Sequence, residues 1–284
     1  MVCKNIDLYE YFNKPKKVGT RGILTLYIHD EFPEMGLDRQ RPAMLICPGG
    51  GYAYCSAREG EPLAIYYLNQ SFNTFVLDYT CAPDDCYPTQ LLEACMAIAY
   101  IKENAKELHV LENKVGVMGF SAGGHLACSV SCLYDEKVVK DYLLDKASLC
   151  RPDASVLCYP VIVNGELAHK GSLVNVSGGN EELADFLSLE KRINKDCPPA
   201  FIWTTQNDTA VPSENSLLVA LAYKKAKVPF ELHIFEEGQH GLALCNDETC
   251  GDKNPILDNP QVSKWLMLCD AFLKKHGFCL PKLY

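Results

Sequence analysis

The sequence predicts an α/β protein with a mainly parallel central sheet and helices on both faces. Short apolar runs rich in β-forming residues alternate with helical patterns along nearly the whole chain, as in sheets built with right-handed crossovers. The 284 residues are 48% hydrophobic and 22% charged, so a large core can be buried. Because no repeat or linker interrupts the chain, we expect one domain over residues 1–284, with residues 1–20 as an N-terminal extension.

Strands are expected wherever β-forming residues run together between turn signals, and runs that are apolar throughout indicate strands buried on both faces. The expected strands are residues 22–28, 43–47, 74–79, 115–118, 154–159, 200–205 and 230–235. Apolar residues at helical spacing predict helices at residues 58–70, 89–108, 122–133, 135–149, 181–193, 213–227 and 261–276. Residues 161–198 contain four glycines and many polar residues, so we expect a small lid or excursion there.

Composition excludes several classes of function. The net charge is −9 and there is no basic run, which argues against nucleic-acid binding. No run of eighteen apolar residues suggests a membrane span, and the first residues lack the features of a signal peptide, so we expect a cytoplasmic protein. The fifteen cysteines include no C-x-x-C pair, so we expect reduced, buried thiols and neither a metal site nor a cofactor.

The segment from residue 113 to residue 133 contains the sequence Gly119-Phe120-Ser121-Ala122-Gly123. This G-x-S-x-G pattern lies between a predicted strand and a predicted helix, the context in which it forms a sharp turn that exposes a nucleophilic serine. The pentapeptide alone is a weak pattern that also occurs by chance. Its flanking elements favour Ser121 as a nucleophile, which requires a base and an acid elsewhere in the chain.

Seven histidines compete for the role of base. His240 follows the last predicted strand and lies in a glycine-bounded loop, whereas His125 follows Ser121 on its helix and is expected to pack or hydrogen-bond beneath the turn. Asp208 follows a buried strand and precedes a helix, which places it at the same edge of the sheet. The alternatives are a surface histidine and a capping aspartate, but the order Ser121, Asp208, His240 favours a catalytic triad.

Three consecutive glycines, Gly49 to Gly51, follow the buried run at residues 43–47. Glycine lets backbone N–H groups come close to a ligand, and ligands bind at the carboxyl ends of strands in such sheets. The alternative is a flexible turn. Tyr52 and Tyr54 come just after these glycines, where they are expected either to line the substrate site or to pack.

Over residues 43–273 the sequence resembles the α/β-hydrolase superfamily, specifically the acetyl esterases of the acetylxylan esterase-like or BD-FAE type. The resemblance is carried by CPGGGY with SAREGEP, the YP-x-x-LL segment, GFSAGGHLA, YPVI, SLEKRI, NDTAVP with ENSLL, and ELHIFEEGQHGLAL. It implies an α/β-hydrolase fold without a cofactor, and an oxyanion hole made by the backbone N–H groups of Gly50, Gly51 and Ala122. Pro48 stands where lipase-type HGGG sequences have histidine.

The resemblance implies a serine esterase that forms an acyl-enzyme and removes short acyl groups, chiefly acetyl, from xylo-oligosaccharides or similar carbohydrates. The expected partner is therefore a small-molecule ester, and the oligomeric state stays open. Three alternatives remain: an amide hydrolase of the arylformamidase or peptidase kind, a binding module without catalysis, and a carbohydrate-binding or xylanase activity. For the last we find no obvious pair of carboxylates, although sequence spacing does not exclude one.

Overall fold

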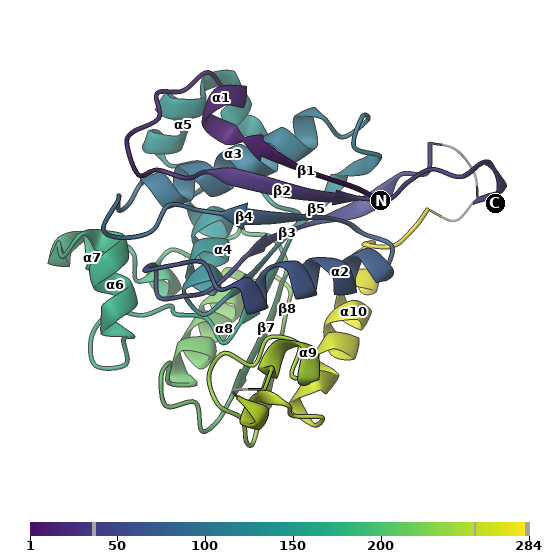
Figure 1. The fold of residues 1–284 in the computed structure, drawn as a ribbon. Helices are drawn as coiled ribbons and strands as arrows, with labels where there is room; N and C mark the ends of the chain where they lie inside the picture. The colour runs from purple at the N-terminus through teal and green to yellow at the C-terminus, as the bar shows by residue number, and fades with distance from the viewer. Residues whose placement is uncertain (36–37, 253, 282–284) are drawn as a thin grey trace.

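The computed structural model describes residues 1–35, 38–252 and 254–281. Within these ranges eight strands form one sheet in the order β1-β2-β4-β3-β5-β6-β7-β8 (Figure 1). β2 pairs antiparallel with β1 and β4, and all other neighbours are parallel. The strands are β1 (Val2–Asp7), β2 (Ile23–Ile28), β3 (Arg41–Cys47), β4 (Asn73–Asp78), β5 (Val110–Phe120), β6 (Ala154–Cys158), β7 (Ala200–Thr205) and β8 (Phe230–Phe235).

Helices cover both faces of the sheet, as expected for a mainly parallel sheet (Figure 1). The larger core lies between the sheet and α1, α3, α4, α5 and α8, and the smaller one lies under α2 and α10. None of the helices in the described ranges has the length and apolar character needed to span a bilayer. The helices are α1 (Leu8–Tyr11), α2 (Glu61–Asn69), α3 (Thr89–Glu103), α4 (Ala122–Leu133), α5 (Lys137–Leu143), α6 (Lys170–Ser177), α7 (Glu181–Phe186), α8 (Glu214–Ala226), α9 (Asp247–Cys250) and α10 (Trp265–Lys275).

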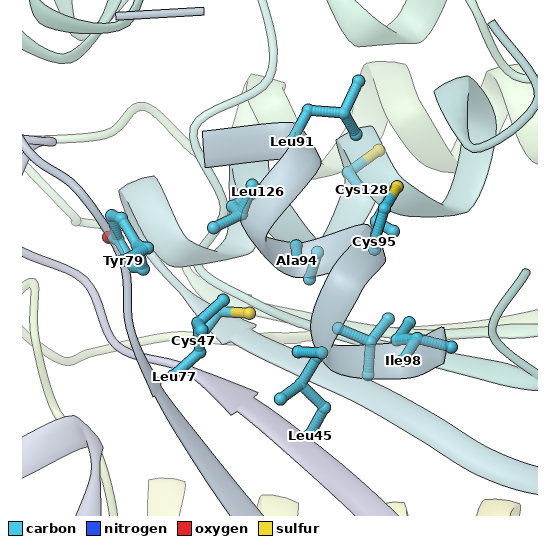
Figure 2. Close-up of a cluster of buried hydrophobic side chains, with 14 of the residues drawn as sticks. Leu45, Cys47, Leu77, Tyr79, Leu91, Ala94, Cys95, Ile98, Leu126 and Cys128 are labelled. Carbon is cyan, nitrogen blue, oxygen red and sulfur yellow. The ribbon is translucent and has the colours of Figure 1, made fainter. Parts of the chain in front are cut away.

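The central strands are apolar throughout because both of their faces are buried. In β3, Leu45 and Cys47 belong to the larger core, while Met44 and Ile46 belong to the smaller one. Figure 2 shows part of the larger core, where side chains of β3 and of the β4 strand end pack against α3 and α4: Leu45, Cys47, Leu77, Tyr79, Leu91, Ala94, Cys95, Ile98, Leu126 and Cys128. All fifteen cysteines are free thiols, and most act here as small apolar side chains.

The predicted α/β class and its mainly parallel sheet are confirmed, with changes at the N-terminus. Residues 1–20 are not merely an extension, since β1 adds an antiparallel edge strand to β2 and α1 follows it directly. The sequence of β1 has no apolar run because the strand lies at the sheet edge and its first four residues are exposed.

Other differences concern helix ends. The helix predicted over residues 89–108 ends at Glu103, where the side chain of Asn104 donates a hydrogen bond to the carbonyl of Tyr100. The segment over residues 161–198 contains α6, which the sequence did not predict, and a shorter α7 than expected. Gly178 ends α6 in a left-handed conformation, which glycine adopts without strain.

A buried carboxyl group joins the N-terminal residues to α3. Glu93 is fully buried and accepts hydrogen bonds from the hydroxyl of Tyr9 at 2.8 Å and from the hydroxyl and backbone N–H of Thr80 at 2.5 and 2.6 Å. Burial raises the pKa of Glu93 to about 7, although these hydrogen bonds act in the opposite direction. Ionisation of Glu93 therefore disfavours the folded state.

We expect Glu93→Gln to weaken the pH dependence of the free energy of unfolding. Because the folded-state pKa of Glu93 lies above its usual value of 4.5, its contribution to stability is complete below pH 4.5 and is lost as the pH rises through 7. The loss amounts to at most ~3 kcal/mol. Urea unfolding of both proteins at several pH values between 4.5 and 8 measures it. The exposed Glu107→Gln is the control, and parallel profiles for wild type and Glu93→Gln would contradict the expectation.

Candidate active site

Ser121 lies in a sharp turn between β5 and α4. Its φ is 54°, a strained value for a residue other than glycine. A Cβ atom on Gly119 would overlap the carbonyl of Gly123, and one on Gly123 would overlap the carbonyl of Cys47 at the end of β3. The turn is fixed from the next strand as well, since the N–H of Ser121 donates to the carbonyl of Cys158 at 3.0 Å. Ser121 is therefore held at the carboxyl edge of the sheet.

The structure brings Ser121, His240 and Asp208 together. The Oγ of Ser121 is 2.8 Å from Nε2 of His240, and Nδ1 of His240 is 2.6 Å from Oδ2 of Asp208. The other oxygen of Asp208 accepts the backbone N–H groups of Ala210 and Val211, each at 2.9 Å. The Asp208 side chain is 1% exposed and that of His240 is 22% exposed. An acceptor at Nδ1 keeps the proton there, which leaves Nε2 free to accept from the serine.

The glycine loop that follows β3 lies beside Ser121. Gly50 and Gly51 have φ values of 122° and 64°, and both line the cavity that contains Ser121 and His240. In the described part of the chain, the backbone N–H groups of Gly50, Gly51 and Ala122 donate to no protein acceptor. A substrate oxygen is the natural partner for such donors, since amides without an acceptor are rare in folded proteins.

Glu59 connects the glycine loop to the loop that carries His240. It is 3% exposed, and its two oxygens accept the N–H of Gly49 at 2.8 Å and the hydroxyl of Tyr159 at 2.7 Å. The same hydroxyl accepts the N–H of Ala243, and the Tyr159 ring lies edge-on to His240 at 5.0 Å between ring centroids. One buried carboxyl group therefore influences the position of both loops.

Arg58 forms a second connection between these loops. Its guanidinium donates to the carbonyls of Gly241 at 2.9 Å and Thr249 at 2.8 Å. Sequence reasoning assigned no role to Arg58, Glu59 or Tyr159. The sequence offered one indication of their importance, which is their place in segments that carry the family resemblance. Arg58 and Glu59 lie in SAREGEP, and Tyr159 lies in YPVI.

His125 lies beneath the turn rather than in the cavity, in agreement with its expected packing role. Its Nε2 donates to the carbonyl of Leu187 at 2.9 Å, so its Nδ1 accepts from the hydroxyl of Tyr52 at 2.9 Å. Burial lowers the pKa of His125 to about 4, so the ring is neutral at pH 7. Of the two expectations for Tyr52, the substrate-lining one is wrong: Tyr52 is 1% exposed, and it packs against Tyr79 with its hydroxyl hydrogen-bonded to His125.

The cavity in front of Ser121 has a volume of about 340 Å³. Tyr54 lies at its rim and is 59% exposed, so it remains a candidate for substrate contact. His169, which the sequence did not single out, also lines the cavity and comes from the segment predicted as a lid. The lining residues are Gly50, Gly51, Tyr54, Ser56, Arg58, Glu59, Ser121, His169, His240 and Gly241.

The described residues contain one group of three side chains that are close enough together to share a metal ion. It comprises Glu31, Asp38 and His109. His109 directly precedes β5, whereas Ser121 directly follows it, so the group lies at the opposite edge of the sheet from Ser121. Glu31 and Asp38 are exposed, and exposed acidic groups of this kind are common without a metal.

Glu59→Gln is expected to lower kcat for hydrolysis of an aryl acetate at least tenfold with little change in KM. The amide has one acceptor oxygen where Glu59 uses two, so either Gly49 or Tyr159 loses its partner, at a cost of about 1–3 kcal/mol. The exposed Glu61→Gln, two residues away, is the control and should behave as wild type. An unchanged kcat in folded Glu59→Gln would show that neither loop depends on this carboxyl group.

Comparison with known proteins shows which family this chain resembles. The BD-FAE family matches residues 32–223. Endo-1,4-beta-xylanase B of Butyrivibrio fibrisolvens is 37% identical over 251 residues, which are 86% of this chain and 38% of that protein. The acetylxylan esterase of Xylanibacter ruminicola is 31% identical over 211 residues, which are 71% of this chain and 41% of that protein. The chain thus spans less than half the length of these two relatives.

Solved structures match over nearly the whole chain. The acetyl ester-xyloside bifunctional hydrolase of Caldicellulosiruptor lactoaceticus is 37% identical with a TM-score of 0.77, and the match covers 90% of this chain and 89% of that one. The carboxylesterase Cest-2923 of Lactobacillus plantarum is 27% identical with a TM-score of 0.84, covering 99% and 100%. With the family match over residues 32–223, these likenesses show that the chain belongs to the BD-FAE family, an esterase family of the α/β-hydrolase superfamily.

Proposed function

We propose that the protein is a serine esterase that removes short acyl groups, chiefly acetyl, from acetylated xylo-oligosaccharides or similar carbohydrates. One observation carries the proposal: the Oγ of Ser121 is hydrogen-bonded to His240 at 2.8 Å, beside backbone N–H groups that have no acceptor among the described residues. A nucleophile next to a base and next to donors for a developing oxyanion is the arrangement that acyl transfer requires.

In the first half of the reaction, the Oγ of Ser121 attacks the ester carbonyl while Nε2 of His240 takes the hydroxyl proton. Asp208 stabilises the resulting imidazolium through its hydrogen bond to Nδ1. The carbonyl oxygen becomes an oxyanion that the N–H groups of Gly50, Gly51 and Ala122 stabilise, each by ~3 kcal/mol. The bond to the alcohol then breaks, and His240 returns the proton to the leaving oxygen.

In the second half, a water molecule takes the place of the departed alcohol. His240 removes a proton from the water, whose oxygen attacks the acyl-enzyme carbonyl through the same oxyanion site. Collapse of this second intermediate releases the acid and returns the proton to Ser121. Apart from the ester and the water, each step uses groups of the chain. His240 carries the transferred proton at Nε2 only while each tetrahedral intermediate exists.

The size and lining of the cavity support a short acyl group. Its volume is about 340 Å³, and the described residues that line it are glycines and polar side chains, with no aliphatic side chain among them to hold a fatty chain. The names of the Xylanibacter and Caldicellulosiruptor proteins, an acetylxylan esterase and an acetyl ester-xyloside hydrolase, support acetylated xylo-oligosaccharides as the substrate class.

Two other activities, amide hydrolysis and glycoside hydrolysis, must be distinguished from ester hydrolysis. Amide hydrolysis would use the same groups, so a substrate comparison must decide between ester and amide. Glycoside hydrolysis needs two carboxyl groups on either side of the sugar bond. Glu59 is the single carboxyl residue among those that line the cavity in the described part of the chain, and both of its oxygens are already hydrogen-bonded. We therefore do not extend the xylanase and xyloside activities of the relatives to this chain.

Ser121→Ala should fold and lose at least about a thousandfold in kcat with an aryl acetate, because no other group can form the acyl-enzyme. Asp208→Asn should lose up to ~10⁴-fold, since the amide favours the wrong tautomer of His240. Folded His125→Asn should retain turnover because His125 does not line the cavity. The roles would be reversed if His125→Asn abolished turnover while His240→Ala did not.

The preference for acetyl should appear as a fall in kcat/KM from aryl acetate through butyrate to octanoate. Each methylene that fits poorly disfavours the transition state by ~1–3 kcal/mol. Acetate release from acetylated xylo-oligosaccharides tests whether the alcohol part of the substrate is a carbohydrate. Comparison with hydrolysis of formylkynurenine tests whether the enzyme prefers esters to amides. A maximum at octanoate would reject the short-acyl proposal, and faster amide hydrolysis would reject the esterase assignment.

A further inference from the structure

A second histidine, His169, lines the cavity opposite the glycine loop. It lies in the segment over residues 161–198, directly before α6, and shares the cavity with Ser121 and His240. A Cβ atom on Gly51 would lie 3.9 Å from Cε1 of His169, which places the imidazole across from a loop whose amides have no acceptor among the described residues. The mechanism above assigns this side chain no part.

The helix that carries His169 is attached to the glycine loop. The side chain of Asn175 donates to the carbonyl of Gly51 at 2.8 Å, and the carbonyl of Val176 accepts the N–H of Tyr87 at 2.8 Å. Leu173 and Val176 are buried in the larger core. α6 is thus a packed part of the site, and it presents His169 at a defined place beside the glycine loop.

Hydrogen bonds decide which nitrogen of His169 carries the proton. The backbone N–H of Ser172 points at Nδ1 at 3.3 Å, and the Ser172 hydroxyl lies 2.8 Å from the same atom. A backbone N–H only donates, so Nδ1 must accept, and the neutral ring carries its proton on Nε2. Burial, and then the neighbouring His240, lower the pKa of His169, which keeps the ring neutral at pH 7. Within the described residues, Nε2 makes no hydrogen bond.

We infer that His169 is a specificity residue that recognises the alcohol part of the ester. Its Nε2–H donates a hydrogen bond to a second oxygen of the alcohol, which is attached to the carbon adjacent to the one that bears the ester oxygen. The inference rests on the proposed esterase function. His240 must protonate the leaving alcohol, so the alcohol lies next to His240, in the cavity that His169 also lines. A donor there favours esters of vicinal diols, which include partly acetylated sugars, over esters of simple alcohols.

A matched pair of substrates tests this role without relying on any one sugar. Ethyl acetate and 2-hydroxyethyl acetate differ by one hydroxyl group, placed next to the ester as in a sugar. We expect wild type to prefer 2-hydroxyethyl acetate in kcat/KM, and His169→Phe to reduce that preference about five- to tenfold, the value of one hydrogen bond. The change should fall mainly on KM for 2-hydroxyethyl acetate, and the loss of kcat/KM should be larger for this ester than for ethyl acetate.

Two further variants complete the experiment. His169→Gln places an amide N–H near the position of Nε2 and should keep most of the preference, whereas His169→Ala is a second variant without a donor. The exposed neighbour Lys170→Ala is the control for disturbance at the start of α6. An equal loss on both esters would overturn the inference, because it would place His169 on the carbonyl group that both share. An unchanged preference in both donor-free variants would overturn it as well.

The outcome is separable from that of the proposed function. Acetate release from acetylated xylo-oligosaccharides by wild type decides whether the substrate is a carbohydrate ester, and the two small esters decide what His169 does. Wild type that hydrolyses both small esters without any preference would contradict the role of His169 alone. Wild type that hydrolyses neither an aryl acetate nor the small esters would overturn the esterase function and this inference with it.

Discussion

The close approach of three backbone segments around Ser121 is the constraint on which the rest of the site depends. The end of β3, the end of β5 and the first turn of α4 meet so tightly that Gly119 and Gly123 have no room for a Cβ atom. Two hydrogen bonds hold Ser121 at a φ of 54°. Its N–H donates to the carbonyl of Cys158 in β6, and its carbonyl accepts the N–H of Val161. Because the packing leaves no alternative, the strained turn and its neighbouring amides form one rigid unit.

Two buried polar side chains extend this order to the surrounding loops. Glu59 joins Gly49 to Tyr159, whose hydroxyl also accepts from the loop after His240. His125 joins Tyr52, under the glycine loop, to the carbonyl of Leu187. A buried polar group that loses its partner costs about 1–3 kcal/mol, so each of these side chains favours a single arrangement of the segments that it connects.

The excursion over residues 161–198 belongs to the same unit. His125 donates a hydrogen bond to the carbonyl of Leu187 in this segment, and Asn175 of the segment donates one to the carbonyl of Gly51. That hydrogen bond orients the Gly51–Tyr52 peptide, and His169, directly before α6, lines the cavity of about 340 Å³ in front of Ser121. The hydrogen bond from Asn175 to Gly51 would thus help to position both His169, which is proposed to bind the alcohol, and the glycine loop, which is proposed to stabilise the oxyanion.

Local sequence predicted most of the central strands and helices and singled out Ser121, Asp208 and His240, which the structure brings within hydrogen-bonding distance. Apolar runs such as residues 43–47 indicate buried strands because both faces need apolar side chains, and polar residues that follow such strands must meet at one edge of the sheet. Tertiary structure alone decided the edge strand β1, whose first four residues are exposed, and the burial of Tyr52, which contacts His125 and Tyr79. It also decided the positions of Glu59 and His169 beside Ser121. Glu59 is hydrogen-bonded to Tyr159, and His169 lines one cavity with Ser121 and His240. All of these residues lie far apart in the sequence, and such an arrangement has no local pattern from which it can be predicted.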